Sequence, residues 1–494
     1  MAGWQVALDL NDQKGGSEQP IFIRLARAIS DDVRRGRLKP GDALPGSRSL
    51  ARELGVHRNT VLAAYAELAA EGWITTEAAA RTFVSHALPD VEAPSSRRRA
   101  AAPATLGFEL SVRREDRETR EARHELRPPP HTLAMSGGIP DVRLLPTAPL
   151  ARAYRRALKR GGPTLLGYGD ARGHARLRAA LGEMLSALRG VAADEESLMV
   201  TRGSQLALDL VARTLLQPGD VVAVEALGYR PAWTALARAG ARVQPVPVDE
   251  RGIDVDALEA LAARERLRAI YVTPHHQYPT TAMLDAGRRL RLLELARARR
   301  IAVIEDDYDF EFHYEGRPVL PLASVDRHAV VVYIGTLSKI LAPSLRLGFV
   351  VAPPPFVERL AIERLAIDRQ GDQVVECAVA ELIEDGELQR HVRRMRRIYQ
   401  VRRDVLVAQV QKRLGGVVEV APPPGGMALW GRVDREVDVD AWAARALARG
   451  VWFNPASRFA FDGRPRPWLR LGFAALDERE LDEGVKRMAA TLRG

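Results

Sequence analysis

The hydrophobic pattern at the start of the chain predicts three short helices and a small β structure. In residues 20–35, apolar side chains recur at every fourth position, the spacing of one helix face: Ile21, Leu25, Ile29 and Val33. A second helix is expected at 47–54, with Ser47 as its N-cap and Gly55 as its stop. A third is expected from Asn59 to Glu71. The apolar pieces 73–75 and 82–84 predict two strands that pair as a small wing.

Residues 89–130 lose this regular pattern. Prolines, serines and charged residues fill the stretch, and few apolar side chains interrupt it. Such a composition buries little surface, so it predicts a solvated linker. The chain therefore divides into a domain at 1–88, a linker at 89–130 and a larger domain at 131–494.

From residue 131 onward, β-branched runs alternate with long amphipathic helices. This alternation predicts an α/β fold with a mostly parallel sheet that is covered on both faces. The candidate strands are 198–201, 221–225, 269–273, 301–305, 329–334 and 348–351. Beyond Pro353 the chain turns helical and regains strand character at 427–433 and 468–473, which predicts a smaller C-terminal α+β subdomain.

Composition limits the function classes only loosely. An apolar content of 46% with 28% charged residues is ordinary for a soluble globular protein. The formal charge of +10 allows a polyanionic partner without requiring one. The single Cys377 excludes intramolecular disulfides and suits a reducing cytoplasm, and we expect it to be a small core residue rather than a catalytic one. We see no apolar run of ~18 residues and no basic-then-apolar leader, so we expect neither a membrane span nor a signal peptide.

The second and third predicted helices fit a helix-turn-helix, because a tight Gly-Val turn joins them and the third begins with polar side chains. This region resembles the winged-helix domain of the GntR family of bacterial transcription factors. The matching runs are Gly-Arg-Leu-Lys-Pro-Gly-Asp at 36–42, Leu-Pro-x-Ser-Arg-x-Leu-Ala at 44–51 and Val-His-Arg-Asn-Thr-Val at 56–61. The resemblance implies that Arg48 and Arg58 contact double-stranded operator DNA, with Asn59 and Thr60 at the start of the recognition helix.

One departure and one alternative accompany this resemblance. Wings of the family carry glycines where this chain has Ala-Ala-Ala-Arg at 78–81, a change that bears on the wing's contact with the minor groove. The alternative is a winged helix that binds protein, in which Arg48 and Arg58 are merely solvated.

A lysine near the end of a predicted strand carries the chemistry of the larger domain. Lys339 follows the apolar run 329–334 on a hydroxyl-rich turn that includes Ser338, and Arg346 comes seven residues later. A lysine amine forms a Schiff base with an aldehyde, while hydroxyls and a guanidinium hold a phosphate. Pyridoxal 5'-phosphate (PLP) is a cofactor that carries both groups.

Further residues point to the same cofactor. A strand, a glycine turn and a helix start at 199–205 would offer the backbone N–H groups of Ser204 and Gln205 to the phosphate. Asp306, at the end of a buried strand, would pair with the pyridinium nitrogen, and Tyr308 would reach the ring hydroxyl from the same side of an extended chain. The alternative for this run is an acidic surface turn.

Two more residues suit the ring and a ligand. Tyr229 follows a strand and could stack on the cofactor ring, although packing would explain an isolated tyrosine equally well. Arg470 lies in the apolar run 468–473, and a buried arginine needs a carboxylate partner, either internal or from a ligand.

Together these segments resemble fold type I PLP enzymes of the aspartate aminotransferase superfamily, over nearly all of 131–494. The resemblance implies that Lys339 is the Schiff-base lysine and that Arg470 grips the α-carboxylate of a ligand. The implied contacts to the cofactor's ring and phosphate are Asp306, Tyr308, Tyr229, Ser204, Gln205, Ser338 and Arg346. Tyr168 matches a tyrosine that reaches the phosphate in the neighbouring subunit, which implies a dimer.

One motif departs from the superfamily. Where its enzymes have Asn-Pro-x-Gly, this chain reads His-Gln-Tyr-Pro-Thr-Thr at 276–281, and Gln277 or Tyr278 could replace the missing asparagine donor. The pair His275-His276 has no third metal ligand at useful spacing, so we expect no metal.

Two runs, His-Gln-Tyr-Pro-Thr at 276–280 and Glu-Asp-Asp-Tyr-Asp at 305–309, resemble the MocR subfamily of GntR-type regulators. Members of this subfamily fuse a winged helix to an aminotransferase-like domain. The resemblance implies a cytoplasmic, head-to-tail homodimer and a PLP-dependent transcriptional regulator that senses an amino compound. Two alternatives stay open. One is a working aminotransferase with an accessory DNA-binding domain, and the other is a regulator that senses PLP itself.

Overall fold

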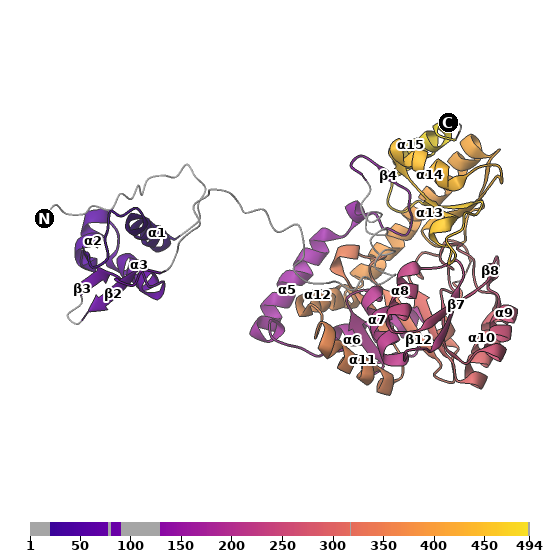
Figure 1. Cartoon of the computed structure of the whole chain (residues 1–494), viewed down its shortest axis with the longest axis horizontal. Helices are drawn as coiled ribbons and strands as arrows, with labels where there is room; N and C mark the ends of the chain where they lie inside the picture. Colours follow the sequence, from indigo (N-terminus) through magenta and orange to yellow (C-terminus); the bar gives the residue numbers. More distant parts are fainter. Residues whose placement is uncertain (1–19, 78–80, 90–128, 317, 493–494) are drawn as a thin grey trace. The chain divides into compact units, whose positions relative to one another are not determined.

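The computed structural model describes residues 20–77, 81–89, 129–316 and 318–492, which form two compact units (Figure 1). Each unit has its own hydrophobic core, and each is described here by itself. Most of the predicted linker 89–130 and the wing tip at 78–80 lie outside the described residues. No helix in the described part of the chain is long and apolar enough to cross a membrane.

The N-terminal unit is a three-helix winged fold. Its elements are α1 (Ile21–Arg34), β1 (Ala43–Leu44), α2 (Ser47–Leu54), α3 (Arg58–Ala70), β2 (Ile74–Glu77) and β3 (Arg81–Val84). Strands β2 and β3 pair antiparallel, as predicted for the wing, and β1 adds to the other side of β3. The predicted apolar face of α1 is confirmed, since Leu25, Ile29 and Val33 are buried in the core, while Ile21 at the helix start is half exposed.

The helix ends correct one prediction. Gly46, not Ser47, is the N-cap of α2, and Ser47 is the first residue of the helix without a capping side-chain bond. Gly55 ends α2 in the left-handed conformation at φ 65°, as predicted. The cap of α3 is His57, whose side chain accepts a hydrogen bond from the Asn59 backbone N–H.

The larger unit is built on a seven-stranded sheet in the order β5-β13-β12-β11-β10-β6-β7. Only β13 runs against the others, so the predicted mostly parallel sheet is confirmed. The strands are β5 (Leu198–Thr201), β6 (Val221–Glu225), β7 (Arg242–Val246), β10 (Leu267–Val272), β11 (Ala302–Asp307), β12 (Val331–Thr336) and β13 (Gly348–Val351). The strands β11 and β12 each run two residues further than predicted.

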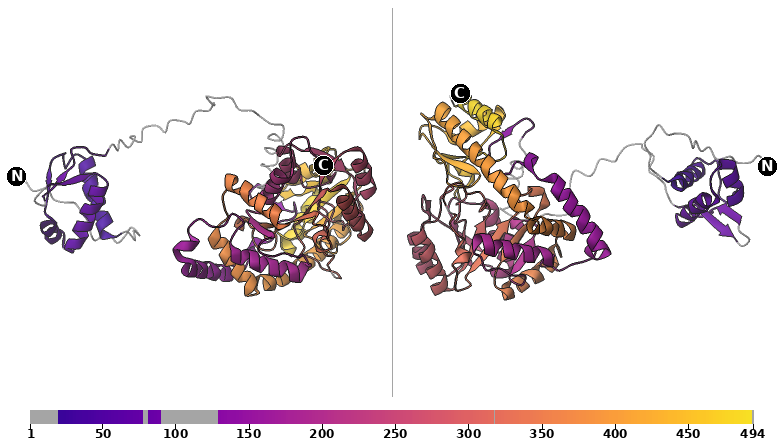
Figure 2. Two further views of the ribbon diagram at one scale, coloured as in Figure 1. Left: turned by 90° about the horizontal axis from the view of Figure 1, so that it is seen from below. Right: turned by 180° about the vertical axis from the view of Figure 1, so that it is seen from behind.

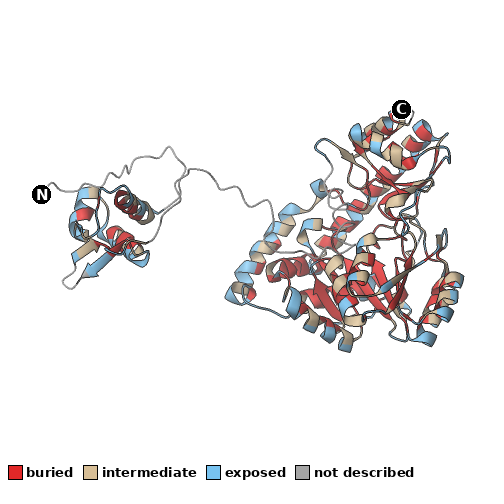
Figure 3. Ribbon diagram, viewed as in Figure 1, coloured by how far each residue is buried: buried red, intermediate tan, exposed pale blue. Residues whose placement is uncertain are grey.

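Helices cover both faces of this sheet, which is buried in the middle (Figure 3). One face packs against α7 (Ser204–Leu215), α8 (Arg230–Arg238) and α11 (Pro354–Ile367). The other face shares its core with the remaining helices α6 (Ala175–Arg189), α9 (Val255–Arg264), α10 (Ala286–Arg299), α12 (Gln373–Glu384) and α13 (Glu387–Leu414). Helix α5 (Thr147–Leu165) packs on α12, and the predicted core position of Cys377 in α12 is confirmed.

The C-terminal subdomain lies at one end of this unit (Figures 1 and 2). It has a four-stranded antiparallel sheet in the order β14-β15-β18-β17, as the α+β prediction required. Its elements are β14 (Val418–Glu419), β15 (Ala428–Val433), α14 (Val439–Ala448), β17 (Asn454–Pro455), β18 (Trp468–Gly472) and α15 (Glu478–Ala490). The short pairs β4 (Leu133–Ala134) with β16 (Val451–Trp452) and β8 (Val248–Asp249) with β9 (Gly252–Ile253) complete the strands. Short 3-10 turns lie at Val142–Leu144, Leu322–Ser324, Pro343–Leu345 and Ala456–Arg458.

Strand β4 attaches the beginning of this unit to its C-terminal end. Leu133 and Ala134 pair in parallel with Val451 and Trp452. Just beyond, the buried Asp141 accepts a hydrogen bond from Arg402 of α13 at 3.1 Å. The segment from 133 to 141 is therefore fixed to the subdomain, and it passes directly beside the site described next.

Candidate cofactor and ligand site

The carboxyl ends of the parallel strands gather the predicted cofactor residues. Asp306 lies near the end of β11, Lys339 follows β12, the start of α7 follows β5, and Tyr229 follows β6. Because β12, β11, β10 and β6 are sheet neighbours, their carboxyl ends meet at one edge. Four strand ends thus bring the candidate residues to one edge of the sheet.

Asp306 is buried and has one free oxygen. Its Oδ2 accepts a hydrogen bond from the Tyr271 hydroxyl at 2.8 Å, whereas Oδ1 has no hydrogen-bond partner among the described residues. Burial raises the pKa of this carboxyl to about 6, against the lowering effect of the Tyr271 hydrogen bond. A buried acceptor without a partner is costly, so this oxygen fits a ligand donor such as a pyridinium N–H.

Lys339 lies on the turn after β12 and is partly buried. Burial lowers the pKa of its amine, and the negative charges of Asp309 and Asp306 oppose that shift. A lowered amine pKa increases the fraction of neutral, nucleophilic lysine. The backbone of Gly138 lies close to the Lys339 amine, since a Cβ atom added at Gly138 would lie 3.9 Å from Lys339 Nζ.

A cradle suited to a phosphate forms where α7 begins. Gly203 is the N-cap of α7 at φ 76°, and Ser204 and Gln205 open the helix, so their N–H groups lie in its unpaired first turn. Arg346 closes the cradle, because a Cβ atom at Gly203 would lie 2.9 Å from Arg346 Nη2. Any side chain at position 203 would therefore meet the guanidinium. Ser338, the residue before Lys339, is buried, and its backbone N–H donates to Thr336 Oγ1 at 3.1 Å.

Arg470 is buried on β18 without a carboxylate. It donates one hydrogen bond from Nη1 to the Pro279 carbonyl, while Nε and Nη2 have no partner in the described parts of the chain. The Tyr278 ring lies 4.7 Å from its guanidinium carbon, a cation–π contact on one side. The backbone of Gly137 lies beside Arg470 Nε: a Cβ atom added at Gly137 would be 3.1 Å from that nitrogen. The two unpaired N–H groups fit the carboxylate of a ligand.

Aromatic rings line the space between these groups. Tyr278 lies edge-on to Tyr229, Tyr308 and Phe459, with ring centroids 5.6, 5.9 and 5.4 Å apart. The Tyr308 hydroxyl donates to the His276 carbonyl at 2.8 Å, so a contact with the cofactor's ring oxygen requires this hydrogen to turn away.

Gln277 is an unfavourable substitute for the missing asparagine. Its amide nitrogen donates to the Leu227 carbonyl at 2.7 Å and to the Tyr278 carbonyl at 2.6 Å. Its amide oxygen accepts from the Thr280 N–H and hydroxyl. The side chain thus holds its own turn together. Among the described contacts, both of its donors are used, which favours Tyr278 of the two alternatives.

Other candidates lie outside this cluster or at its border. Gln205 donates from Nε2 to the Pro231 carbonyl, so only its backbone N–H suits the phosphate. Tyr168 is 84% exposed and has the Arg369 guanidinium 4.6 Å from its ring.

In the N-terminal unit, Arg48, Arg58 and Asn59 are exposed and Thr60 is half-buried at the start of α3. Arg58 also approaches Ser47 of α2, with Nε 3.5 Å from the hydroxyl.

Sequence reasoning missed three features of the site. Tyr271 was not singled out because its hydroxyl reaches Asp306 from a different strand. The buried Asp309, paired with His276 Nδ1 at 2.7 Å, was part of a motif but had no assigned role. Gly137 and Gly138 carried only a weak signal, a glycine pair before the first long helix.

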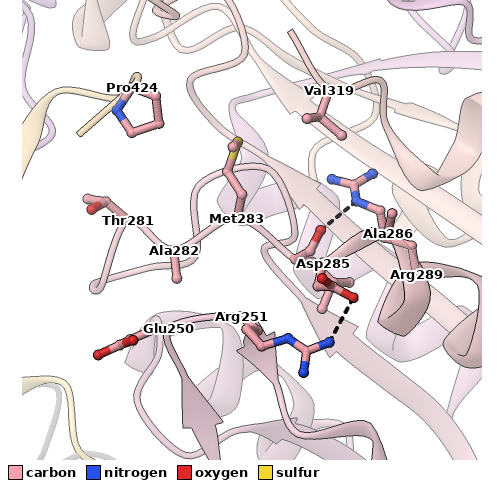
Figure 4. A pocket seen from close by; sticks show the side chains of 11 residues that line it. Glu250, Arg251, Thr281, Ala282, Met283, Asp285, Ala286, Arg289, Val319 and Pro424 are labelled. Carbon is pink, nitrogen blue, oxygen red and sulfur yellow. Dashed lines mark hydrogen bonds and ion pairs between the residues drawn. The ribbon is translucent and has the colours of Figure 1, made fainter. Parts of the chain in front are cut away.

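A separate pocket opens beside the turn at 276–281 (Figure 4). Its lining includes Thr281, Met283 and Pro424, with the ion pair of Arg251 and Asp285 at 3.1 Å on its wall. The buried Arg289 donates to three backbone carbonyls, so its guanidinium is occupied. None of the cofactor candidates lines this pocket.

Comparison with known proteins agrees with this division of the chain. The family model "Aminotransferase class I and II" matches residues 141–488, and the model "Bacterial regulatory proteins, gntR family" matches residues 23–84. The chain is 33% identical to the probable rhizopine catabolism regulatory protein MocR of Rhizobium meliloti, over 96% of this chain and 94% of that protein. The chain is a MocR-type regulator of the GntR family.

Two further relatives support both halves of the assignment. This MocR-type chain is 31% identical to the HTH-type transcriptional regulator TauR of Rhodobacter capsulatus, over 97% and 98% of the two chains. Its larger unit resembles the solved structure of LysN, an α-aminoadipate aminotransferase of Thermus thermophilus bound to a phosphopyridoxyl-leucine compound. That match has a TM-score of 0.70 and 32% identity, and it covers 76% of this chain and 94% of LysN. The predicted fold type I domain is thereby confirmed.

The burial of Asp306 predicts a pH-dependent stability of the cofactor-free protein. The pKa of this carboxyl rises from 3.8 when unfolded to about 6 when folded, so the folded state binds the proton more tightly. This contribution to stability is present below pH 4 and is lost as pH rises through 6, by about 3 kcal/mol in total. Asp306→Asn should therefore stabilise the cofactor-free protein at pH 8 and leave its stability unchanged at pH 4.

Urea unfolding of both proteins at the two pH values measures this difference. Burial raises the pKa values of Glu225 and Glu305 to about 7 as well. Asp306 does not act on Glu305, which therefore cancels in the comparison, whereas the charge of Asp306 adds to the raised pKa of Glu225. The substitution removes that contribution, so Glu225 changes stability at pH 8 in the same direction as Asp306 itself. Equal effects of the substitution at pH 4 and pH 8 would contradict the prediction.

Proposed function

We propose that this MocR-type protein is a PLP-dependent transcriptional regulator that senses an amino compound bearing a carboxylate or a similar anion. One observation carries the proposal. Residues suited to PLP and to a ligand carboxylate lie in the unit that matches the aminotransferase family, and a unit that matches the GntR family precedes it in the same chain. PLP, when bound, supplies an aldehyde that amines attack and a phosphate for the cradle at α7.

Each residue then has a distinct role. Lys339 holds the cofactor through its amine, Asp306 pairs with the pyridinium nitrogen, and Arg346 with the start of α7 binds the phosphate. Tyr229 packs against the ring. Tyr308 and Tyr278 lie toward the ring oxygen, and Arg470 receives the anionic end of the effector.

The effector would compete with Lys339 for the aldehyde. Its amine must lie at the Lys339 end of the site while its carboxylate reaches the free Nε and Nη2 of Arg470. A ligand changes the equilibrium between two states of the protein only by as much as it binds them differently. A difference of ~1–3 kcal/mol would give a usable change in DNA binding.

We propose that the active form is a head-to-tail homodimer in the cytoplasm. The exposed large apolar side chains of the larger unit include Leu166 (70%), Tyr168 (84%) and Leu365 (55%). A second copy would cover such residues, and Tyr168 of one copy would contact the phosphate bound in the other. A dimer would also suit two DNA half-sites.

The second candidate is a working aminotransferase, which the resemblance of the larger unit to LysN favours. Turnover of an amino donor with a keto acid would support it. A third candidate, sensing of PLP itself, needs only the cofactor residues. DNA binding that responds to PLP but to no amine would favour that reading.

Replacing the lysine tests the cofactor attachment. Lys339→Ala should abolish the visible absorption band of protein incubated with PLP, because no amine remains at that position to join the aldehyde. DNA binding by the N-terminal unit should be retained in a gel-shift assay without effector. An unchanged visible spectrum would show that another residue holds the cofactor.

Replacing Arg58 tests the DNA interface. Arg58→Ala should weaken operator binding and, if the contact is to a phosphate, reduce the salt dependence of binding by about one ion. The visible spectrum with PLP should not change. Arg52→Ala is the matched control, since Arg52 is an exposed arginine in the last turn of α2. Equal affinities of the two variants would place the recognition helix elsewhere.

Replacing Arg470 tests the effector class. Arg470→Gln should weaken the spectral response to amino acids by at least tenfold, since a charge-assisted hydrogen-bonded pair contributes about 1.5–3 kcal/mol. The spectrum with PLP alone should stay the same. Amines that lack the carboxylate are the control, because they should affect wild type and variant equally. A preserved amino-acid response in the variant would exclude Arg470 as the carboxylate site.

A further inference from the structure

The hydroxyl of Tyr271 has a single described partner, the cofactor-binding carboxylate. Tyr271 lies on β10 and Asp306 on the neighbouring parallel strand β11, where Tyr271 is level with Ile304. Both Tyr271 and Ile304 belong to the core that packs under α7 and α8. The Tyr271 side chain is fully buried, and its hydroxyl extends along the sheet to Asp306 Oδ2 at 2.8 Å.

This bond decides which oxygen of Asp306 is available. A carboxylate has two equivalent oxygens and rotates freely unless a partner holds one of them. With Oδ2 bound to Tyr271, Oδ1 is the oxygen left without a partner among the described residues. A ligand N–H is therefore directed to one fixed acceptor.

The same bond opposes the effect of burial on charge. Burial favours the neutral acid and raises the pKa of Asp306 to about 6, while the donated hydrogen bond from Tyr271 stabilises the carboxylate and lowers it. Tyr271 remains a donor, since burial raises its own pKa well above the ordinary value. Without the hydroxyl, Asp306 would be protonated at a higher pH and could no longer pair with a pyridinium.

We propose that Tyr271 is a positioning residue for the cofactor: its hydroxyl holds Asp306 Oδ2 and so directs Oδ1 to the cofactor, without touching the cofactor itself. The effect on the charge of Asp306 described above is the part of this role that a titration can detect. The inference rests on the proposed binding of PLP at this site. It adds a residue on a strand from which the sequence motifs assign none.

The test is the affinity for PLP of the full-length Tyr271→Phe protein, measured between pH 6 and pH 9. Its Kd relative to wild type should be about tenfold higher at pH 6 to 7, the effect of losing one hydrogen bond to a charged group. The ratio should fall toward one as pH rises, because both carboxylates are then ionised. Lys339 and the cofactor titrate in both proteins and cancel in the ratio.

The matched control is Tyr333→Phe. Tyr333 is also fully buried, and it donates to the neighbouring carboxylate Asp307 at 2.6 Å, but its core lies on the other face of the sheet. Asp307 acts on Asp306 only through its charge and not through a hydrogen bond. Loss of the Tyr333 hydroxyl should therefore change the ratio of Kd values with pH much less than loss of the Tyr271 hydroxyl. A flat ratio for Tyr271→Phe would show a merely structural role and overturn the inference.

A double variant tests whether the effect of Tyr271→Phe acts through Asp306, and circular dichroism checks that each protein is folded. In the Asp306→Asn background no carboxylate remains to be oriented or ionised, so adding Tyr271→Phe should change the Kd for PLP by less than twofold at every pH. A further pH-dependent loss in the double variant would overturn the inference. Absence of PLP binding by wild type would instead overturn the proposed function, and the inference with it.

Discussion

The site depends on a carboxylate that is buried before any ligand arrives. Asp306 is buried near the end of a central strand, and within the described part of the chain only one of its oxygens has a hydrogen-bond partner. Such an arrangement is unfavourable for folding, since a buried charge without full compensation raises the free energy of the folded state. The sheet around it must therefore be stable enough to hold the group in place. Seven strands with helices on both faces provide that stability.

The same edge explains why the other residues are where they are. The parallel strands β5, β12, β11 and β6 each end at a candidate residue or turn, so the order of the strands determines the order of the candidate cofactor residues. Ligands of open α/β sheets bind at the carboxyl ends of strands for this reason. Arg470 comes from the separate antiparallel sheet of the C-terminal subdomain. The subdomain therefore supplies the residue suited to an anionic ligand, and the main sheet supplies those suited to the cofactor.

Much of the fold followed from sequence because its signals are local. The strands at 198–201, 221–225 and 348–351 match the structure exactly in extent, since short apolar runs bounded by polar turns are read without knowing their neighbours. Lys339, Asp306 and Arg470 could be selected because a charged residue in an apolar run is unusual. Ser47 was misassigned as a cap because a serine at a helix start is common in both roles, and only the backbone angles of Gly46 distinguish them.

The parts that could not be predicted are contacts between distant segments. Tyr271 and Asp306 are 35 residues apart, and nothing in either local sequence indicates that a hydroxyl of one strand reaches a carboxylate of the next. Gln277 was one of two candidates to replace the asparagine donor, but its donors are used by carbonyls that only the folded turn brings near. Hydrogen-bond partners of this kind depend on register and side-chain direction, which a single sequence does not specify.

The glycine pair at 137–138 lies on the only covalent path from the DNA-binding unit into the larger unit. This path first pairs with the C-terminal subdomain through β4 and then runs past Arg470 and Lys339 before it is anchored at Asp141. A ligand that fills the space between the arginine and the lysine must share it with that backbone. One short stretch of backbone thus borders the binding site and also joins the start of the larger unit to its C-terminal subdomain.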